Sequence, residues 1–145
     1  MWILEPWRSP WTARMLSVLR IVVGVLYFEH GTQKMFDVPP IGPWHGYHLV
    51  SQMGLAGILE TFGGLAILFG FLTRPVAFIL AGEMAWAYFQ VHIHRSVFPI
   101  NNRGDNVVLF CFSFLYFVFA GGGPWSIDAL IARSKHRGLP GTLTG

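Results

Sequence analysis

The 145-residue chain has few charged residues and a single cysteine, and each shortage excludes a class of protein. Charged residues make up 12% of the sequence, about half the usual fraction in soluble domains, whereas 53% of the residues are hydrophobic. A lone Cys111 cannot form an intrachain disulfide or a CxxC redox pair. Because the length suits one domain, the composition indicates a single membrane domain over residues 1–145.

Basic residues are too few and too dispersed for a surface that binds nucleic acid, although the formal net charge is +3. They instead predict orientation, because Lys and Arg near the ends of membrane helices favour the cytoplasmic side. The N-terminus, one short turn and the C-terminal tail carry Arg8, Arg14, Arg74, Arg133, Lys135 and Arg137. The other two connections carry only Lys34, Arg95 and Arg103. Both termini are therefore predicted to be cytoplasmic.

Apolar segments predict an all-α integral membrane protein, a four-transmembrane-helix antiparallel bundle. The spans cover about residues 14–35, 53–72, 75–94 and 107–120. A short amphipathic helix over about residues 126–134 follows a glycine-rich turn. Residues 1–12 contain three tryptophans and are predicted to be a lead-in at the membrane interface. Glu29 and His30 stand where a signal-peptide cleavage site would be needed, so we expect the first span to be uncleaved.

Several ionisable residues fall inside these spans, where an unpaired charge costs several kcal/mol. Helical spacing puts Arg20 on one stripe of the first span together with Tyr27, His30 and Lys34, while Glu29 and Gln33 point roughly the opposite way. Similar depth in the membrane predicts an ion pair between Arg20 and Glu83. By the same reasoning, Glu60 is predicted to pair with His30 or Lys34.

Two interpretations of these polar residues remain open. They form ion pairs that only fix how the helices pack, or they line a pocket between helices that binds a polar head group or relays protons. No catalytic residue can be assigned. The candidates for the pocket and its ion pairs are Arg20, Glu29, His30, Gln33, Lys34, Glu60, Glu83, Trp86, Gln90 and Asp105.

Histidines gather on the predicted outer side and suggest a metal site. His45, His48, His92 and His94 could converge there, and neutral imidazole suits copper or zinc. The alternative is that these are ordinary solvated loop histidines.

Several short motifs follow one another in a fixed order along the chain. They are Leu19-Arg20 with Gly24, His30-Gly31-x-Gln33-Lys34-Met35, Leu59-Glu60-x-x-Gly63-Gly64-Leu65, Leu68-x-Gly70-x-Leu72-Thr73-Arg74, His92 to Pro99, Gly104-Asp105 and Gly123 to Leu130. In this order the motifs resemble the DoxX family of small bacterial membrane proteins. The chain departs from the family pattern at Glu29, where relatives often have an apolar residue, and at Asp105, where glutamate is common.

The resemblance implies a multi-pass protein of the bacterial inner membrane. DoxX-like proteins resemble membrane components of oxidoreductase systems, one branch being associated with thiosulfate oxidation coupled to quinone and another with oxidative-stress assemblies. We therefore expect a membrane subunit or anchor of such a system, with quinone as the candidate ligand and membrane lipids around it. No motif for flavin, haem or an iron–sulfur cluster is present, so we expect a protein partner or a homo-oligomer, and no catalysis by the chain alone.

Two alternatives come from other functional classes. The chain could be a scaffold or assembly factor that presents glycine-rich helix faces to other membrane helices. It could also be a proton-coupled carrier that uses Glu60 and Glu83.

Overall fold

The computed structural model describes residues 9–40 and 50–137, which contain helices and no β-strand. The all-α prediction is therefore confirmed for this part of the chain. Within it, α1 and α2 are long and apolar enough to cross a membrane, and α5 is a shorter apolar helix. The elements are α1 (Pro10–Phe36), α2 (Gln52–Phe69), α3 (Thr73–Ala87), the π-helical turn η2 (Tyr88–His92), α4 (Pro99–Asn102), α5 (Asp105–Ala120) and α6 (Ile127–Arg137).

The first helix starts earlier than its apolar pattern indicates. Ser9 caps it by accepting a hydrogen bond from the Trp11 main-chain nitrogen at 3.3 Å, and Pro10 suits the first turn because its missing N–H has no helical partner. The helix thus begins before residue 14, the predicted start of the first span, and includes Pro10 to Thr12 of the predicted lead-in. Residues 1–8, which hold the rest of that lead-in, lie outside the described part.

The second and third helices form the predicted hairpin. Gly70, in a left-handed conformation with φ +68°, ends α2, and α3 begins after a two-residue turn at Thr73. The third helix continues through η2 to His92, so it ends close to its predicted limit but changes from α to π geometry near that end. The change is marked by a hydrogen bond of 3.0 Å from the Ile93 nitrogen to the Tyr88 carbonyl.

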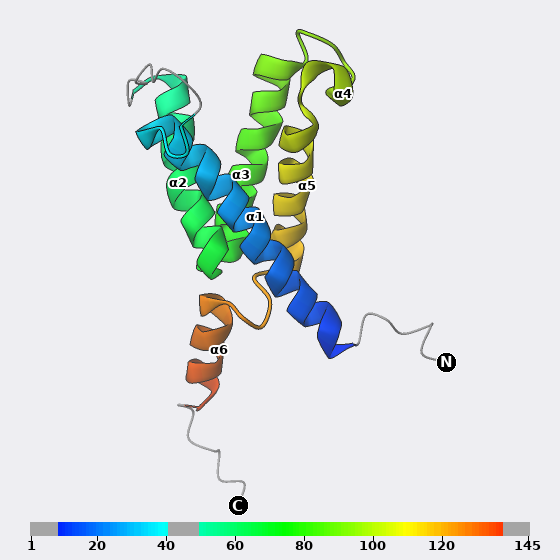
Figure 1. The fold of residues 1–145 in the computed structure, drawn as a ribbon. Coiled ribbons are helices and arrows are strands. Elements are labelled where there is room, and N and C mark those ends of the chain that lie inside the picture. Colours follow the sequence, from blue (N-terminus) through cyan, green and yellow to red (C-terminus); the bar gives the residue numbers. More distant parts are fainter. Residues whose placement is uncertain (1–8, 41–49, 138–145) are drawn as a thin grey trace, which may run out of the picture.

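Figure 1 shows the four longer helices running alternately up and down. The start of α1, the turn between α2 and α3, and the end of α5 lie at one end, where α6 projects away from the bundle. The end of η2 and the short α4 lie at the other end. Contacts join α1 to α2 and α3 to α5, with α2 against α3 between the two pairs.

Glycines bring α1 and α2 into backbone contact. A Cβ atom added to Gly24 would lie 2.6 Å from the Leu68 main-chain nitrogen, and one added to Gly31 would lie 2.3 Å from that of Thr61. From the other side, a Cβ atom on Gly64 would lie 2.7 Å from the nitrogen of Phe28. Glycines thus let the backbones of α1 and α2 approach within the chain itself.

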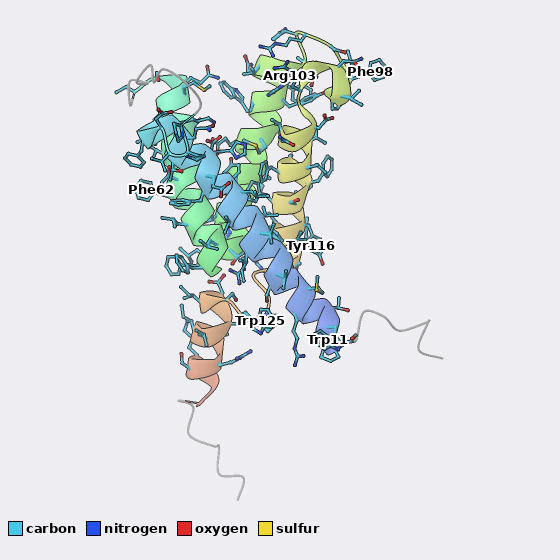
Figure 2. All side chains as sticks on the ribbon, viewed as in Figure 1. Trp11, Phe62, Phe98, Arg103, Tyr116 and Trp125 are labelled. Atoms are coloured by element: carbon cyan, nitrogen blue, oxygen red, sulfur yellow. The ribbon has the colours of Figure 1, made fainter. Side chains whose placement is uncertain are left out.

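The interior is small and aromatic, and many large apolar side chains face outward. Tyr27 and Phe114 pack edge to face with ring centres 4.7 Å apart. Phe62 on α2 and Tyr116 on α5 point away from the bundle (Figure 2), and the Phe62 side chain is 66% exposed. Such an apolar outer surface suits a lipid environment better than water. The buried core residues are Val23, Tyr27, Ile67, Ala77, Leu80, Ala81, Met84, Phe114 and Phe117.

Candidate functional site

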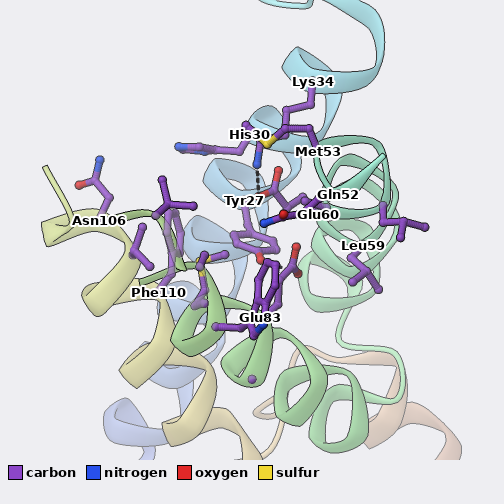
Figure 3. Close-up of a pocket in the computed structure, with 18 of the residues that line it drawn as sticks. Tyr27, His30, Lys34, Gln52, Met53, Leu59, Glu60, Glu83, Asn106 and Phe110 are labelled. Carbon is purple, nitrogen blue, oxygen red and sulfur yellow. Dashed lines mark hydrogen bonds and ion pairs between the residues drawn. The ribbon is translucent and has the colours of Figure 1, made fainter. Parts of the chain in front are cut away.

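A pocket of about 840 Å³ lies between α1, α2, α3 with η2, and α5 (Figure 3). Its apolar lining includes Met53, Leu55, Leu59, Ile79, Met84, Trp86, Val91, Val107 and Phe110. Its polar lining consists of Tyr27, His30, Lys34, Gln52, Glu60, Glu83, His92, Arg103 and Asn106.

An ion pair joins α1 to α2 at one wall of this pocket. Lys34, in the last turn of α1, donates from Nζ to Oε1 of Glu60, whose side chain is only 4% exposed. Gly57 lies one helical turn before Glu60, and a Cβ atom there would come within 3.2 Å of the Lys34 side chain. The glycine therefore makes room for the lysine to cross to α2. The predicted pairing of Glu60 with Lys34 is confirmed.

Tyrosine, and not arginine, is the partner of the carboxyl group on α3. The Tyr27 hydroxyl donates to Glu83 Oε2 at 2.9 Å, and Tyr27 is almost fully buried. The predicted ion pair between Arg20 and Glu83 is therefore wrong. Tyr27 shares the polar stripe of α1 with His30 and Lys34, and this spacing is the sequence signal that could have identified it.

Arg20 is buried away from the pocket and binds main-chain carbonyls. Its Nε donates to Gly122 at 3.2 Å, its Nη1 to Ile67 at 3.3 Å and to Leu68, and its Nη2 to Trp125 at 2.7 Å. Ile67 and Leu68 lie in the last turn of α2, where carbonyls lose their usual partner one turn ahead, and Ile67 also accepts from the Gly70 nitrogen at 3.0 Å. The guanidinium therefore donates hydrogen bonds to carbonyls at the end of α2 and in the glycine-rich segment after α5.

A carboxylate accepts hydrogen bonds at the start of α3, on the other side of the turn that follows α2. Asp128 accepts hydrogen bonds from the main-chain nitrogens of Leu72 and Thr73, each at 2.8 Å. These donors open α3, where a negative charge is favourable. The segment from Gly122 to Asp128 is thus fixed to the turn between α2 and α3, with Arg20 on one side and Asp128 on the other.

Two carboxyl oxygens that face the pocket lack partners. Within the described residues, neither Glu60 Oε2 nor Glu83 Oε1 has a hydrogen-bond partner, although both atoms are buried. Native proteins pair most buried polar atoms, so such acceptors call for an explanation. Figure 3 shows both side chains extending into the space between α1, α2 and α3.

The remaining predicted residues divide between the pocket and the surface. Trp86 lines the pocket, whereas Glu29, Gln90 and Asp105 are exposed and do not. Gln33 also lies outside it and donates to the Pro39 carbonyl at 3.3 Å. The sequence reasoning did not select the other polar lining residues, which are Tyr27, Gln52, Arg103 and Asn106.

The predicted metal site is only half contained in the described residues. His45 and His48 lie outside them. His92 Nδ1 lies 3.0 Å from the Asn102 carbonyl, and His94 is exposed. Residues 9–40 and 50–137 contain no group of three or more His, Cys, Asp or Glu side chains placed to hold a metal. A site that includes His45 and His48 remains a prediction.

Comparison with known proteins gives one family and two similar chains. The profile of the DoxX family matches residues 15–93. An uncharacterized protein of Haemophilus influenzae is 41% identical over 118 residues, which cover 78% of this chain and 87% of that protein. The Inner membrane protein YqjF of Escherichia coli is 32% identical over 127 residues, covering 79% of this chain and 89% of the relative. No solved structure matches the chain.

Proposed function

The chain belongs to the DoxX family of membrane proteins, and from this premise we propose that it crosses the inner membrane four times and binds a quinone head group in its pocket. The location rests on the family and on the E. coli relative, which is named an inner membrane protein. α1 and α2 have the length and hydropathy of membrane spans. α3 with η2 runs without a break from Thr73 to His92, and α5 supplies the fourth span.

Charge at the two ends of the bundle supports an orientation with both termini in the cytoplasm. Arg14, Arg74 and Arg133 lie on the elements at the end that holds both termini of the described helices. Arg95 and Arg103 lie in the connection at the other end. The first group marks the cytoplasmic side by the positive-inside rule.

Labelling of single cysteines tests this topology. Arg74→Cys and Arg95→Cys, each in a Cys111→Ala background, are treated in intact cells with a maleimide that does not cross the inner membrane. We expect labelling at residue 95 and protection at residue 74 until the membrane is opened. The same accessibility at both positions would contradict the four-span arrangement.

The observation that carries quinone binding is a small polar cluster inside an apolar cavity. A volume of about 840 Å³ is within the range of small-molecule sites and accommodates a ring with part of a tail. Lys34 offers ammonium hydrogens beyond the one used on Glu60, and these suit a quinone oxygen. The aromatic and aliphatic walls, including Trp86 and Phe110, suit the ring and tail.

The chain is then the membrane subunit or anchor of a redox system. In this proposal, electrons reach or leave the bound quinone through a partner protein. The chain contributes the site, its orientation and its exclusion of water.

Blocking the pocket from a position without polar contacts tests the proposal. Gly82 lines the pocket, and a Cβ atom there meets nothing within 4 Å, so Gly82→Leu fills the cavity and leaves Lys34 and Glu60 intact. We titrate the detergent-purified protein, without oxygen, with a short-tailed benzoquinone and with its hydroquinone. The variant should weaken whichever form binds by roughly tenfold or more, the loss of about one good contact.

Phe78→Leu is the matched control, because Phe78 lies one turn before Gly82 on α3, is 67% exposed and does not line the pocket. Its affinities should equal those of the wild type. If neither form of the ligand binds the wild type saturably, the proposed function is wrong. If Gly82→Leu binds as tightly as the wild type, the ligand occupies another site.

The scaffold alternative loses its main argument. Gly24, Gly31 and Gly64 pack against backbone atoms of this same chain, as described above, and Gly57 contacts Met35 and Lys34. These faces are therefore already covered and are not presented to a partner. No other observation on the described residues favours a scaffold over a binding protein.

A further inference from the structure

Two buried carboxyl oxygens in the pocket have no donor among the described residues. Glu60 Oε2 and Glu83 Oε1 are buried, and no group in the described residues donates to them. The Tyr27 hydroxyl already gives its hydrogen to Glu83 Oε2. The one ammonium on this wall, Lys34, is engaged with Glu60 Oε1.

His30 adds another acceptor to the same lining. Its Nδ1 lies 2.7 Å from the Leu26 carbonyl oxygen. A carbonyl only accepts, so the hydrogen of this bond is on Nδ1, and in the neutral ring Nε2 is left as an acceptor. The ring is held against Phe110, with centres 5.6 Å apart, which fixes its place in the pocket wall.

We propose that the pocket holds the reduced, hydroxyl-bearing form of its ligand, a hydroquinone-type ring whose O–H groups donate to Glu60 and Glu83. This rests on the proposed function and adds the oxidation state that the site selects. A hydroquinone supplies donors to the two unpartnered carboxyl oxygens, and its own oxygens can still accept from Lys34. The oxygens of a benzoquinone are acceptors too, so they leave both carboxyl oxygens unsatisfied, and unsatisfied buried acceptors disfavour a complex.

Charge favours a neutral donor over a cationic one. Glu83 has no basic side chain within ion-pair distance in the described part, so an ammonium head group would also meet its needs. However, Lys34 already neutralises Glu60, so an ammonium that reaches Glu60 Oε2 would lie beside another cation. A phenolic hydroxyl satisfies the carboxyl groups without adding charge.

Four ligands with one common short tail test the inference: a hydroquinone, the corresponding benzoquinone, the hydroquinone dimethyl ether, which has no donor, and a primary ammonium. Affinities are measured without oxygen on the detergent-purified chain. We expect the hydroquinone to bind roughly tenfold or more tightly than each of the other three, as hydrogen bonds to charged acceptors allow.

Two variants connect this preference to the named oxygens. Glu83→Leu removes one acceptor, so the preference for hydroquinone over benzoquinone should fall by roughly tenfold. Glu83→Gln is the milder variant in case the first does not fold, and it should reduce the preference by about threefold because the amide retains one acceptor oxygen. Glu29→Gln changes an exposed carboxyl group outside the pocket and should leave all four affinities unchanged.

The failures of the two proposals are distinct. If hydroquinone and benzoquinone bind equally well, the selection of the reduced form is wrong while the quinone site stands. Tighter binding of the dimethyl ether or the ammonium than of the hydroquinone also overturns the selection. If none of the ligands binds, the proposed function itself fails.

Discussion

Replacing Gly31 with alanine should push α1 and α2 apart at their closest approach. The added Cβ atom would lie 2.3 Å from the Thr61 main-chain nitrogen, 2.5 Å from the Thr61 Oγ1 and 2.7 Å from the Glu60 carbonyl carbon. Two of these three atoms belong to the backbone of α2, so no side-chain rotation relieves the clash. The helices must separate, and the contact between Lys34 and Glu60, one turn along α1, is strained with them.

Two opposing terms set the size of the effect. Alanine is favoured over glycine in a helix interior by roughly 1 kcal/mol. Overpacking in a close-packed interior costs about 1–3 kcal/mol, and the upper value applies here because the obstacle is backbone. Gly31→Ala should therefore lower the free energy of unfolding by about 2 kcal/mol, the difference between these terms.

Gly82→Ala is the matched control for the same chemical change. Its Cβ atom would meet nothing within 4 Å, so only the propensity term remains, and stability should rise by up to roughly 1 kcal/mol. The two variants are compared by unfolding in mixed micelles, followed by circular dichroism. By the scaling for folded domains of this size, Gly31→Ala should lose about 4–8 °C in Tm. Equal stability of the two variants would refute the backbone contact between α1 and α2.

Three further predictions concern the buried charges. Arg20→Met removes the side-chain donor of the Gly122, Leu68 and Trp125 carbonyls, whereas Ile67 keeps a bond from the Gly70 nitrogen, and the variant should cost about 4 kcal/mol in unfolding free energy. Arg14→Met, at an exposed site that packs on Trp11, should cost about 1 kcal/mol or less, and similar losses for both would contradict the role of Arg20. Lys34→Met leaves the buried Glu60 carboxylate without its partner and should lower the free energy of unfolding by about 3 kcal/mol. The double variant Lys34→Met with Glu60→Gln should recover part of this loss in the same assay. No recovery would mean that the lysine acts by packing. Asp128→Ala removes both acceptors at the start of α3 and should lower the free energy of unfolding by about 2 kcal/mol. Asp105→Ala should cost less, because the start of α5 has no side-chain cap bond. Equal Tm values for the two variants would show that the Asp128 cap is unimportant.

Much of the fold could be predicted from apolar runs and turn residues. The helix limits near residues 35, 75 and 120 agree with the structure to within a few positions, because proline and glycine mark them. The π-helical turn η2 could not be predicted, since it depends on how the end of α3 meets Asn102 and the loop before α5.

Partners of the charged residues were harder to predict than their positions. Helical spacing correctly predicted that Lys34 lies on the polar stripe of the first helix. Similar depth in the membrane then predicted that it pairs with Glu60, which the structure confirms. The same reasoning failed for Arg20, whose acceptors are main-chain carbonyls at a helix end, and main-chain groups carry no sequence signal. The partner of Glu83 was also predicted wrongly, because one of its carboxyl oxygens accepts from the hydroxyl of Tyr27, an uncharged group that charge pairing does not consider.

The junction around Arg20 also has a consequence for biosynthesis. Its acceptors Gly122 and Trp125 follow it by 102 and 105 positions in the chain. At typical ribosomal speeds of roughly 5–20 residues per second, the first helix waits for several seconds before these carbonyls exist. Until the chain has reached Gly122 and Trp125, the Nε and Nη2 hydrogens of Arg20 lack the acceptors that they have in the finished bundle. A segment made long after the first helix thus completes the buried contacts of that helix.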